Sequence, residues 1–127
     1  MTKPGSVIGW KLDRAQREEL LERFPARYRN VIADHVTLQT NAEARPLPDP
    51  VHAAIVGHAD DDDSLEAMVV AIDGKTGRPD GSVFHISWSL DKAKGRAARE
   101  SNDLLRSRDW EAYDEVIPIE LVPARFP

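Results

Sequence analysis

The stretch that decides the fold is Val83-Phe84-His85-Ile86-Ser87-Trp88-Ser89-Leu90. Its apolar residues alternate with His85, Ser87 and Ser89, and successive side chains of a β-strand point to opposite faces of a sheet. The stretch therefore predicts a strand that packs one face into the hydrophobic core. The other face carries the His85 imidazole and the Ser87 hydroxyl side by side, about 6–7 Å apart along the strand.

The same pattern occurs a second time, in His35-Val36-Thr37-Leu38. Here too a histidine and a hydroxyl residue alternate with apolar residues, which predicts a second strand of the same kind over residues 30–40. Asp34 interrupts the apolar face of this strand, so we expect it to reach solvent or to find a partner. The chain thus carries two copies of a histidine–apolar–hydroxyl–apolar motif.

The surrounding sequence predicts further strands over residues 7–12, 52–58, 65–72 and 116–122. The last of these contains Pro118, which favours an edge position in a sheet. One helix is predicted over residues 14–24, capped by Asp13 with Gln16 three residues later and ended by Pro25. A second helix is predicted over residues 96–107.

The predicted elements divide into two halves, each with one helix and one motif strand. We therefore expect a single domain over residues 1–127 with an α+β fold. In this fold an antiparallel sheet forms two pseudo-symmetric halves, each with a helix on its outer side. The two motif strands line a central cleft.

The composition is that of an ordinary folded protein. The 127 residues are 41% hydrophobic and 31% charged, and they include no cysteine, which excludes a disulfide framework and a thiolate zinc site. A net charge of −5 argues against a protein that coats nucleic acid nonspecifically. No apolar run approaches the roughly 20 residues that span a bilayer, and the first residues lack a signal-peptide pattern. We expect a cytoplasmic protein without membrane partners.

The paired motifs suggest acid–base chemistry on a phosphate. An imidazole titrates near neutral pH and can accept or donate a proton, and a hydroxyl on the same strand face can hydrogen-bond a phosphate oxygen. Two facing copies would form a clamp in which one neutral histidine takes a proton from water and the other protonates the departing oxygen. Thr37 and Ser87 would stabilise the charge on the non-bridging oxygens. This scheme requires neither a metal nor a cofactor.

In these motifs the chain resembles the two-histidine (2H) phosphoesterase superfamily, in particular the cyclic phosphodiesterase domain of tRNA ligases and related bacterial RNA-repair proteins. The resemblance also includes Gly9-Trp10-Lys11-Leu12-Asp13 and Ser101-Asn102-Asp103-Leu104-Leu105, and it extends over nearly the whole chain. It implies that His35 and His85 are the catalytic pair and that Thr37 and Ser87 bind phosphate. The implied activity is hydrolysis of 2′,3′-cyclic phosphates at RNA 3′ ends or in small cyclic nucleotides. The spacing from His35 to His85 is short for the superfamily, which leaves the substrate open.

Three further residues are candidates for substrate binding. Lys92 follows the second motif and could attract an RNA backbone, whereas Trp10 and Tyr28 could stack on a base. Two of them also have an ordinary structural explanation: Lys92 belongs to a solvated charged face, and Trp10 suits the core. His52 and His58 lack the hydroxyl two positions later and are expected to be structural.

Two functions other than catalysis stay open at this point. The same cleft could hold a nucleotide or an RNA end without turnover, as a binding module in RNA repair. Alternatively, the motifs are incidental and the protein acts through a surface such as the proline-rich loop of residues 41–50. No obligate protein partner is evident from the sequence.

Overall fold

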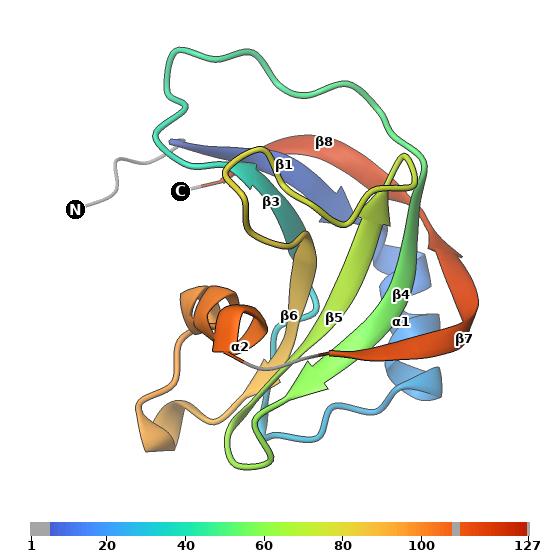
Figure 1. Cartoon of the computed structure of the whole chain (residues 1–127), viewed down its shortest axis with the longest axis vertical. Coiled ribbons are helices and arrows are strands. Elements are labelled where there is room, and N and C mark those ends of the chain that lie inside the picture. The colour runs from blue at the N-terminus through green and yellow to red at the C-terminus, as the bar shows by residue number, and fades with distance from the viewer. Residues whose placement is uncertain (1–5, 108–109, 127) are drawn as a thin grey trace.

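The computed structural model describes residues 6–107 and 110–126. They form an α+β fold with two antiparallel sheets and two α-helices (Figure 1). The smaller sheet has the order β3-β1-β8, and its strands are β1 (Val7–Leu12), β3 (His35–Gln39) and β8 (Leu121–Phe126). The larger sheet has the order β2-β6-β5-β4-β7. Its strands are β2 (Asn30–Val31), β4 (Ala53–Asp60), β5 (Leu65–Ile72), β6 (His85–Leu90) and β7 (Glu111–Ile119).

Helix α1 (Arg14–Arg23) begins as the sequence predicts. The Asp13 carboxylate accepts a hydrogen bond from the backbone N–H of Gln16 at 3.0 Å, which satisfies one of the free donors at the helix start. The Gln16 side chain does not complete a capping box. Instead its amide donates to the carbonyl of Pro118, and its oxygen accepts from the N–H of Glu120, so this residue ties the helix to the turn between β7 and β8.

The two helices cover opposite faces of the larger sheet. Leu20 of α1 belongs to the main core with alternate residues of β5, including Met68 and Val70. Helix α2 (Ser101–Ser107) contributes Leu104 to a second apolar cluster, which contains Val69 from the other face of β5. Figure 1 shows α2 lying over β6 on the side away from α1.

The predicted strand over residues 30–40 is wrong as a single strand, because the chain changes sheets within it. Residues 30–31 pair with β6 in the larger sheet, whereas β3 pairs with β1 in the smaller one. The change occurs at Ala33, which is fully buried and has a φ of +42°. Such a φ is rare for a residue with a Cβ atom, so the sequence gives no sign of this bend.

The other predicted elements overlap the observed ones, but some differ in their ends and one differs in the number of strands. The strand expected over residues 116–122 is two strands, β7 and β8, and β7 lies at the edge of its sheet as Pro118 suggests. The helix expected over residues 96–107 starts as a 3₁₀ turn, η2 (Ala98–Glu100), before α2, and the loop after β6 contains η1 (Lys92–Lys94). Within the described residues, no helix has the length and apolar character needed to cross a bilayer.

Candidate functional site

The bend at Ala33 brings the two motif strands together. Before β3 begins, the N–H groups of Ile32 and Ala33 donate to the carbonyls of Trp88 and Ser87 on β6, both at 2.9 Å. Strand β3 therefore starts beside β6, although the two strands belong to different sheets. The result is that His35 and His85 face the same space.

That space is a pocket of about 400 Å³, a size within the usual range for small-molecule sites. All four motif residues, His35, Thr37, His85 and Ser87, line it. The remaining lining residues that the structure describes are Val7, Ile32, Thr40, Arg78, Ala98, Arg99, Asn102 and Phe126. None of the described lining residues carries a carboxylate. The pocket wall therefore combines two imidazoles, two guanidinium groups and several neutral donors, which suits an anion.

His85 is 9% exposed, and it lies on the same face of β6 as Ser87, which contacts Ala98 and Ser101. Its Nδ1 lies 2.8 Å from the carbonyl oxygen of Val83. A carbonyl only accepts hydrogen bonds, so Nδ1 carries the proton and Nε2 keeps its lone pair in the neutral ring. Burial lowers the pKa of His85 below its ordinary value of 6.5, and the charges of Arg78 and His35 lower it further. His85 is therefore a neutral base at neutral pH.

His35 has a different environment. Its Nδ1 lies 2.9 Å from Oδ2 of Asp34, and its ring packs on Phe126 with the centroids 4.3 Å apart. Asp34 also accepts a hydrogen bond from Arg14 at 2.6 Å, which confirms that this acid finds partners. Burial opposes ionisation of Asp34, but the hydrogen bonds from Arg14 and His35 outweigh it and lower the pKa of this carboxyl below 3.8. A carboxylate at Nδ1 orients the ring and fixes which ring nitrogen carries the proton in the neutral form.

The two hydroxyl residues differ as well. The Ser87 hydroxyl donates to the carbonyl of Ala98 at 2.9 Å and contacts the hydroxyl of Ser101 at 2.8 Å. It thereby joins β6 to the start of helix α2. The hydroxyl of Thr37 forms no hydrogen bond with any part of the chain that the structure describes, and it remains available in the pocket.

Arg78 is a pocket residue that the sequence did not reveal. It lies in the loop between β5 and β6 and is only 8% exposed. Loop residues show no hydrophobic periodicity, so no periodic pattern in the sequence marks Arg78 as a pocket residue. The one available signal is the composition of Gly77-Arg78-Pro79-Asp80-Gly81, where a cation and an anion stand two positions apart in a turn before the motif strand.

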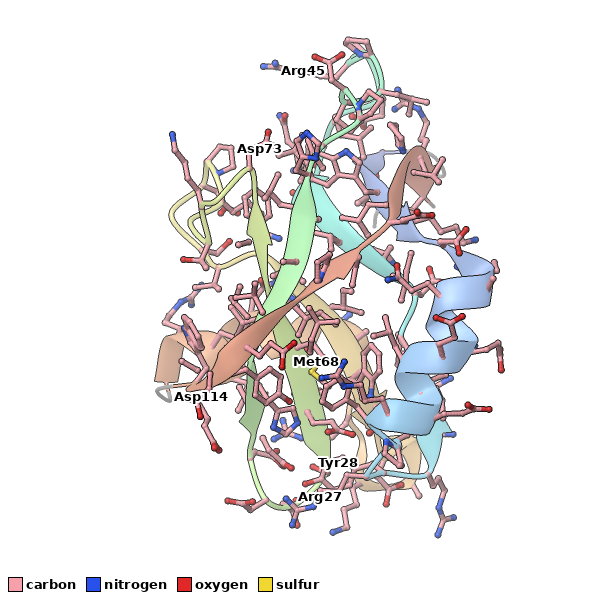
Figure 2. All side chains as sticks on the ribbon, turned by 90° about the vertical axis from the view of Figure 1, so that its right-hand side faces the viewer. Arg27, Tyr28, Arg45, Met68, Asp73 and Asp114 are labelled. Atoms are coloured by element: carbon pink, nitrogen blue, oxygen red, sulfur yellow. The ribbon has the colours of Figure 1, made fainter. Side chains whose placement is uncertain are left out.

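The other predicted substrate-binding residues lie outside the pocket. Trp10 is 3% exposed, donates its indole N–H to the carbonyl of Asp49 at 2.9 Å and belongs to the main core. The hydroxyl of Tyr28 donates to Asp60 at 2.5 Å, and Figure 2 shows Tyr28 beside Arg27, at the opposite end of the molecule from Arg45. Lys92 is exposed in η1 and does not line the pocket.

Two of the basic residues that follow the second motif form ion pairs; the four residues are Lys92, Lys94, Arg96 and Arg99. Lys94 forms an ion pair with Asp63 at 3.0 Å, and Arg96 forms one with Asp61. These contacts hold the loop after β6 against the β4–β5 turn, which gives two of the four cations a structural role. Arg99 is the member of this group that reaches the pocket.

One group of side chains has suitable spacing for a metal ion. The ligand atoms of His58, Asp60 and Glu66 lie within 4.8 Å of one another. Each is already engaged by the protein: His58 contacts Glu66 at 2.7 Å, Glu66 also accepts from Ser89, and Asp60 accepts from Tyr28. The bond from Tyr28 anchors the segment before β2 to the larger sheet, and the group is separate from the motif pocket.

A larger hollow of about 800 Å³ lies elsewhere, over β4 and the β7–β8 turn. Its walls are mainly aliphatic, and they include the exposed large hydrophobic residues Val116 and Val122. His52 and Glu120 are its titratable residues, and none of the motif residues reaches it. Its size alone does not make it the reactive site.

The fold and pocket thus define an α+β protein with a paired-histidine site suited to an anion. Comparisons with protein-family models, with curated proteins and with solved structures found no match to this chain.

Proposed function

We propose that the protein is a metal-independent 2′,3′-cyclic phosphodiesterase that acts on RNA termini or small cyclic nucleotides. The observation that carries the proposal is the shared pocket: two histidine–hydroxyl motifs, from different sheets, line one space with two arginines. A phosphate group needs cationic and hydrogen-bonding partners, and opening its cyclic ester needs one base and one acid.

His85 takes the role of base in this proposal. Its Nε2 is free to accept a proton because Nδ1 donates to Val83, and its lowered pKa keeps it neutral. His35 takes the role of acid, because it is the ring whose Nδ1 lies beside a carboxylate, that of Asp34. The different partners of the two rings make one assignment more favourable than its reverse.

The proposed reaction is a hydrolysis. The oxygen of a water molecule attacks phosphorus while Nε2 of His85 takes one of its protons. The bond between phosphorus and one ribose oxygen breaks, and Nε2 of His35 gives its proton to that oxygen. Thr37 donates a hydrogen bond to a non-bridging oxygen as negative charge accumulates there. The product is a ribose phosphomonoester.

The test is hydrolysis of 2′,3′-cyclic nucleotides in the presence of EDTA. His35→Ala and His85→Ala should each lower kcat/KM by roughly 10²–10⁴-fold, the usual value of a general acid or base. His52→Ala is the matched control, because His52 is exposed and lies outside the pocket. Equal activity in all four proteins would refute the proposal. Binding of a nucleotide without any turnover would instead support the binding-module alternative.

A further inference from the structure

The charged group of Arg78 is built into the pocket wall. Its side chain is 7% exposed, whereas that of its partner Asp80 is 58% exposed. Nε and Nη2 of Arg78 donate to the two carboxylate oxygens of Asp80 at 3.1 and 3.0 Å. This bidentate pairing fixes the plane of the guanidinium, with the anion toward solvent and the cation toward the pocket.

Two further contacts complete the hold on Arg78. Nη2 donates to the side-chain oxygen of Asn102 at 3.3 Å, and Nη1 donates to the backbone carbonyl of Thr37 at 3.4 Å. A guanidinium has five N–H groups, and these four bonds leave one N–H on Nη1. Among the described residues it has no acceptor. Arg78 therefore offers a fixed positive donor next to the free hydroxyl of Thr37.

Ser87 is in the opposite situation. A hydroxyl has one proton, and that of Ser87 is directed to the carbonyl of Ala98. Its oxygen also contacts Ser101, which is fully buried. The second motif therefore lacks the free donor that Thr37 provides in the first. Ser101 is followed by Asn102, so the Ser87 contacts also position the residue that supports Arg78.

We propose that Arg78 binds the reacting phosphate in the pocket beside Thr37, and that Ser87 instead holds helix α2 in place. The inference rests on the proposed function only in taking a phosphate ester as the ligand. The charge of Arg78 also reaches His85, since it contributes to the lowered pKa of that ring. The other titratable or charged groups lining the pocket are His35 and Arg99.

The experiment measures binding rather than turnover. Inorganic phosphate is titrated into wild type, Arg78→Gln, Arg78→Lys and Ser87→Ala, and the His85 ring proton signals are followed by NMR. Loss of one hydrogen bond to a charged group corresponds to a fall in affinity of roughly 10- to 100-fold, which we expect for Arg78→Gln. Arg78→Lys should be intermediate, because lysine keeps the charge but not the fork of donors. Ser87→Ala should keep phosphate affinity within about threefold of wild type while lowering the melting temperature.

A second readout separates binding from folding. In Arg78→Gln the pKa of His85 should rise toward its ordinary value, because a nearby positive charge is removed, whereas in Arg78→Lys, which keeps the charge, the pKa should stay lowered. Unchanged phosphate affinity in Arg78→Gln and Arg78→Lys, or an equal loss in Ser87→Ala, would overturn the inference. Phosphate binding that depends on Arg78 in a protein without hydrolytic activity would support the inference and reject the enzyme. Hydrolysis whose rate is unchanged in the Arg78 variants would reject the inference and support the enzyme.

Discussion

The Nδ1 atom of His35 lies 2.9 Å from Oδ2 of Asp34, its neighbour in the chain. Adjacent residues of a regular strand point to opposite faces, so this contact depends on the bend at Ala33 that precedes β3. The bend thus does two things at once. It directs β3 toward β6, and it supplies the histidine with a carboxylate partner.

This pair leads to a prediction for Asp34→Asn. The variant keeps the shape of the side chain but removes the charged acceptor at Nδ1 of His35. We expect kcat/KM for a 2′,3′-cyclic nucleotide to fall roughly 10- to 100-fold, as for other residues that orient a functional histidine. Arg14→Gln is the control, because Arg14 contacts the same carboxylate from an exposed position. It should lose less than about threefold. Equal losses in the two variants would remove the special role of the Asp34–His35 contact.

The second prediction concerns pH. His85 acts as a base only when neutral, and its pKa is lowered below 6.5, first by burial and then by the charges of Arg78 and His35. Activity should therefore rise with pH through a midpoint below 6.5, and direct NMR titration of the His85 ring should give the same midpoint. A midpoint above 6.5 in both measurements would contradict the role of burial.

The third prediction tests the residues that the structure leaves outside the pocket. Lys92→Gln and Tyr28→Phe should each change kcat/KM by less than about twofold, since neither side chain lines the pocket. Tyr28→Phe should nevertheless lower the free energy of unfolding by about 1–2 kcal/mol, because its hydrogen bond to Asp60 is lost. A large loss of activity in Lys92→Gln, without loss of stability, would show that Lys92 binds the substrate.

The fourth prediction concerns stability in acid. Burial raises the pKa of Asp61, but backbone N–H groups and Arg96 outweigh this and lower it from 3.8 to about 2. A lowered carboxyl pKa means that the stabilisation is fully present above the unfolded value and disappears as pH falls through the folded one. Asp61→Asn should therefore cost about 1–2 kcal/mol at pH 7. The difference from wild type should vanish near pH 2, as measured by urea unfolding. A cost that is constant with pH would assign the effect to shape rather than to charge.

The fifth prediction concerns Gly9, which lies on β1 opposite Thr37. A Cβ atom at this position would lie 2.1 Å from the carbonyl oxygen of Val36, and the backbone of β3 would have to move. Overpacking usually costs about 1–3 kcal/mol. Gly9→Ala should therefore lower the free energy of unfolding by at least about 1 kcal/mol. It should also displace His35, and both unfolding and activity measurements would detect it. Wild-type stability and activity in this variant would show that β3 does not pack as closely on Gly9 as the structure indicates.

Much of the fold is local and could be predicted from the sequence. The alternation in residues 85–90 predicted β6, and Asp13 predicted the start of α1, because both signals come from residues within one element. The bend at Ala33 could not be predicted, since alanine has no preference for a positive φ. It is imposed by pairing with β1 on one side and β6 on the other.

The candidate site was predictable only in part, because a sequence pattern shows local structure but not the contacts between elements. The motif pattern named four pocket residues, because period-2 alternation determines which side chains share a strand face. It did not reveal that His85 is buried, that Ser87 bonds to Ala98, or that Arg78 reaches the pocket from a loop. Each of these depends on contacts between elements. Trp10 illustrates the converse: its place in a strand is local information, but its burial is decided by packing.

The most direct test of the account is a crystal structure with a nucleoside 3′-monophosphate, which the proposed reaction leaves as one of its products. We predict that the phosphate lies between the two rings, with Nε2 of His35 and Nε2 of His85 each within about 2.6–3.2 Å of one of its oxygens. A phosphate bound elsewhere, or rings that cannot both reach it, would contradict the central claim that the two motifs act on one phosphorus atom.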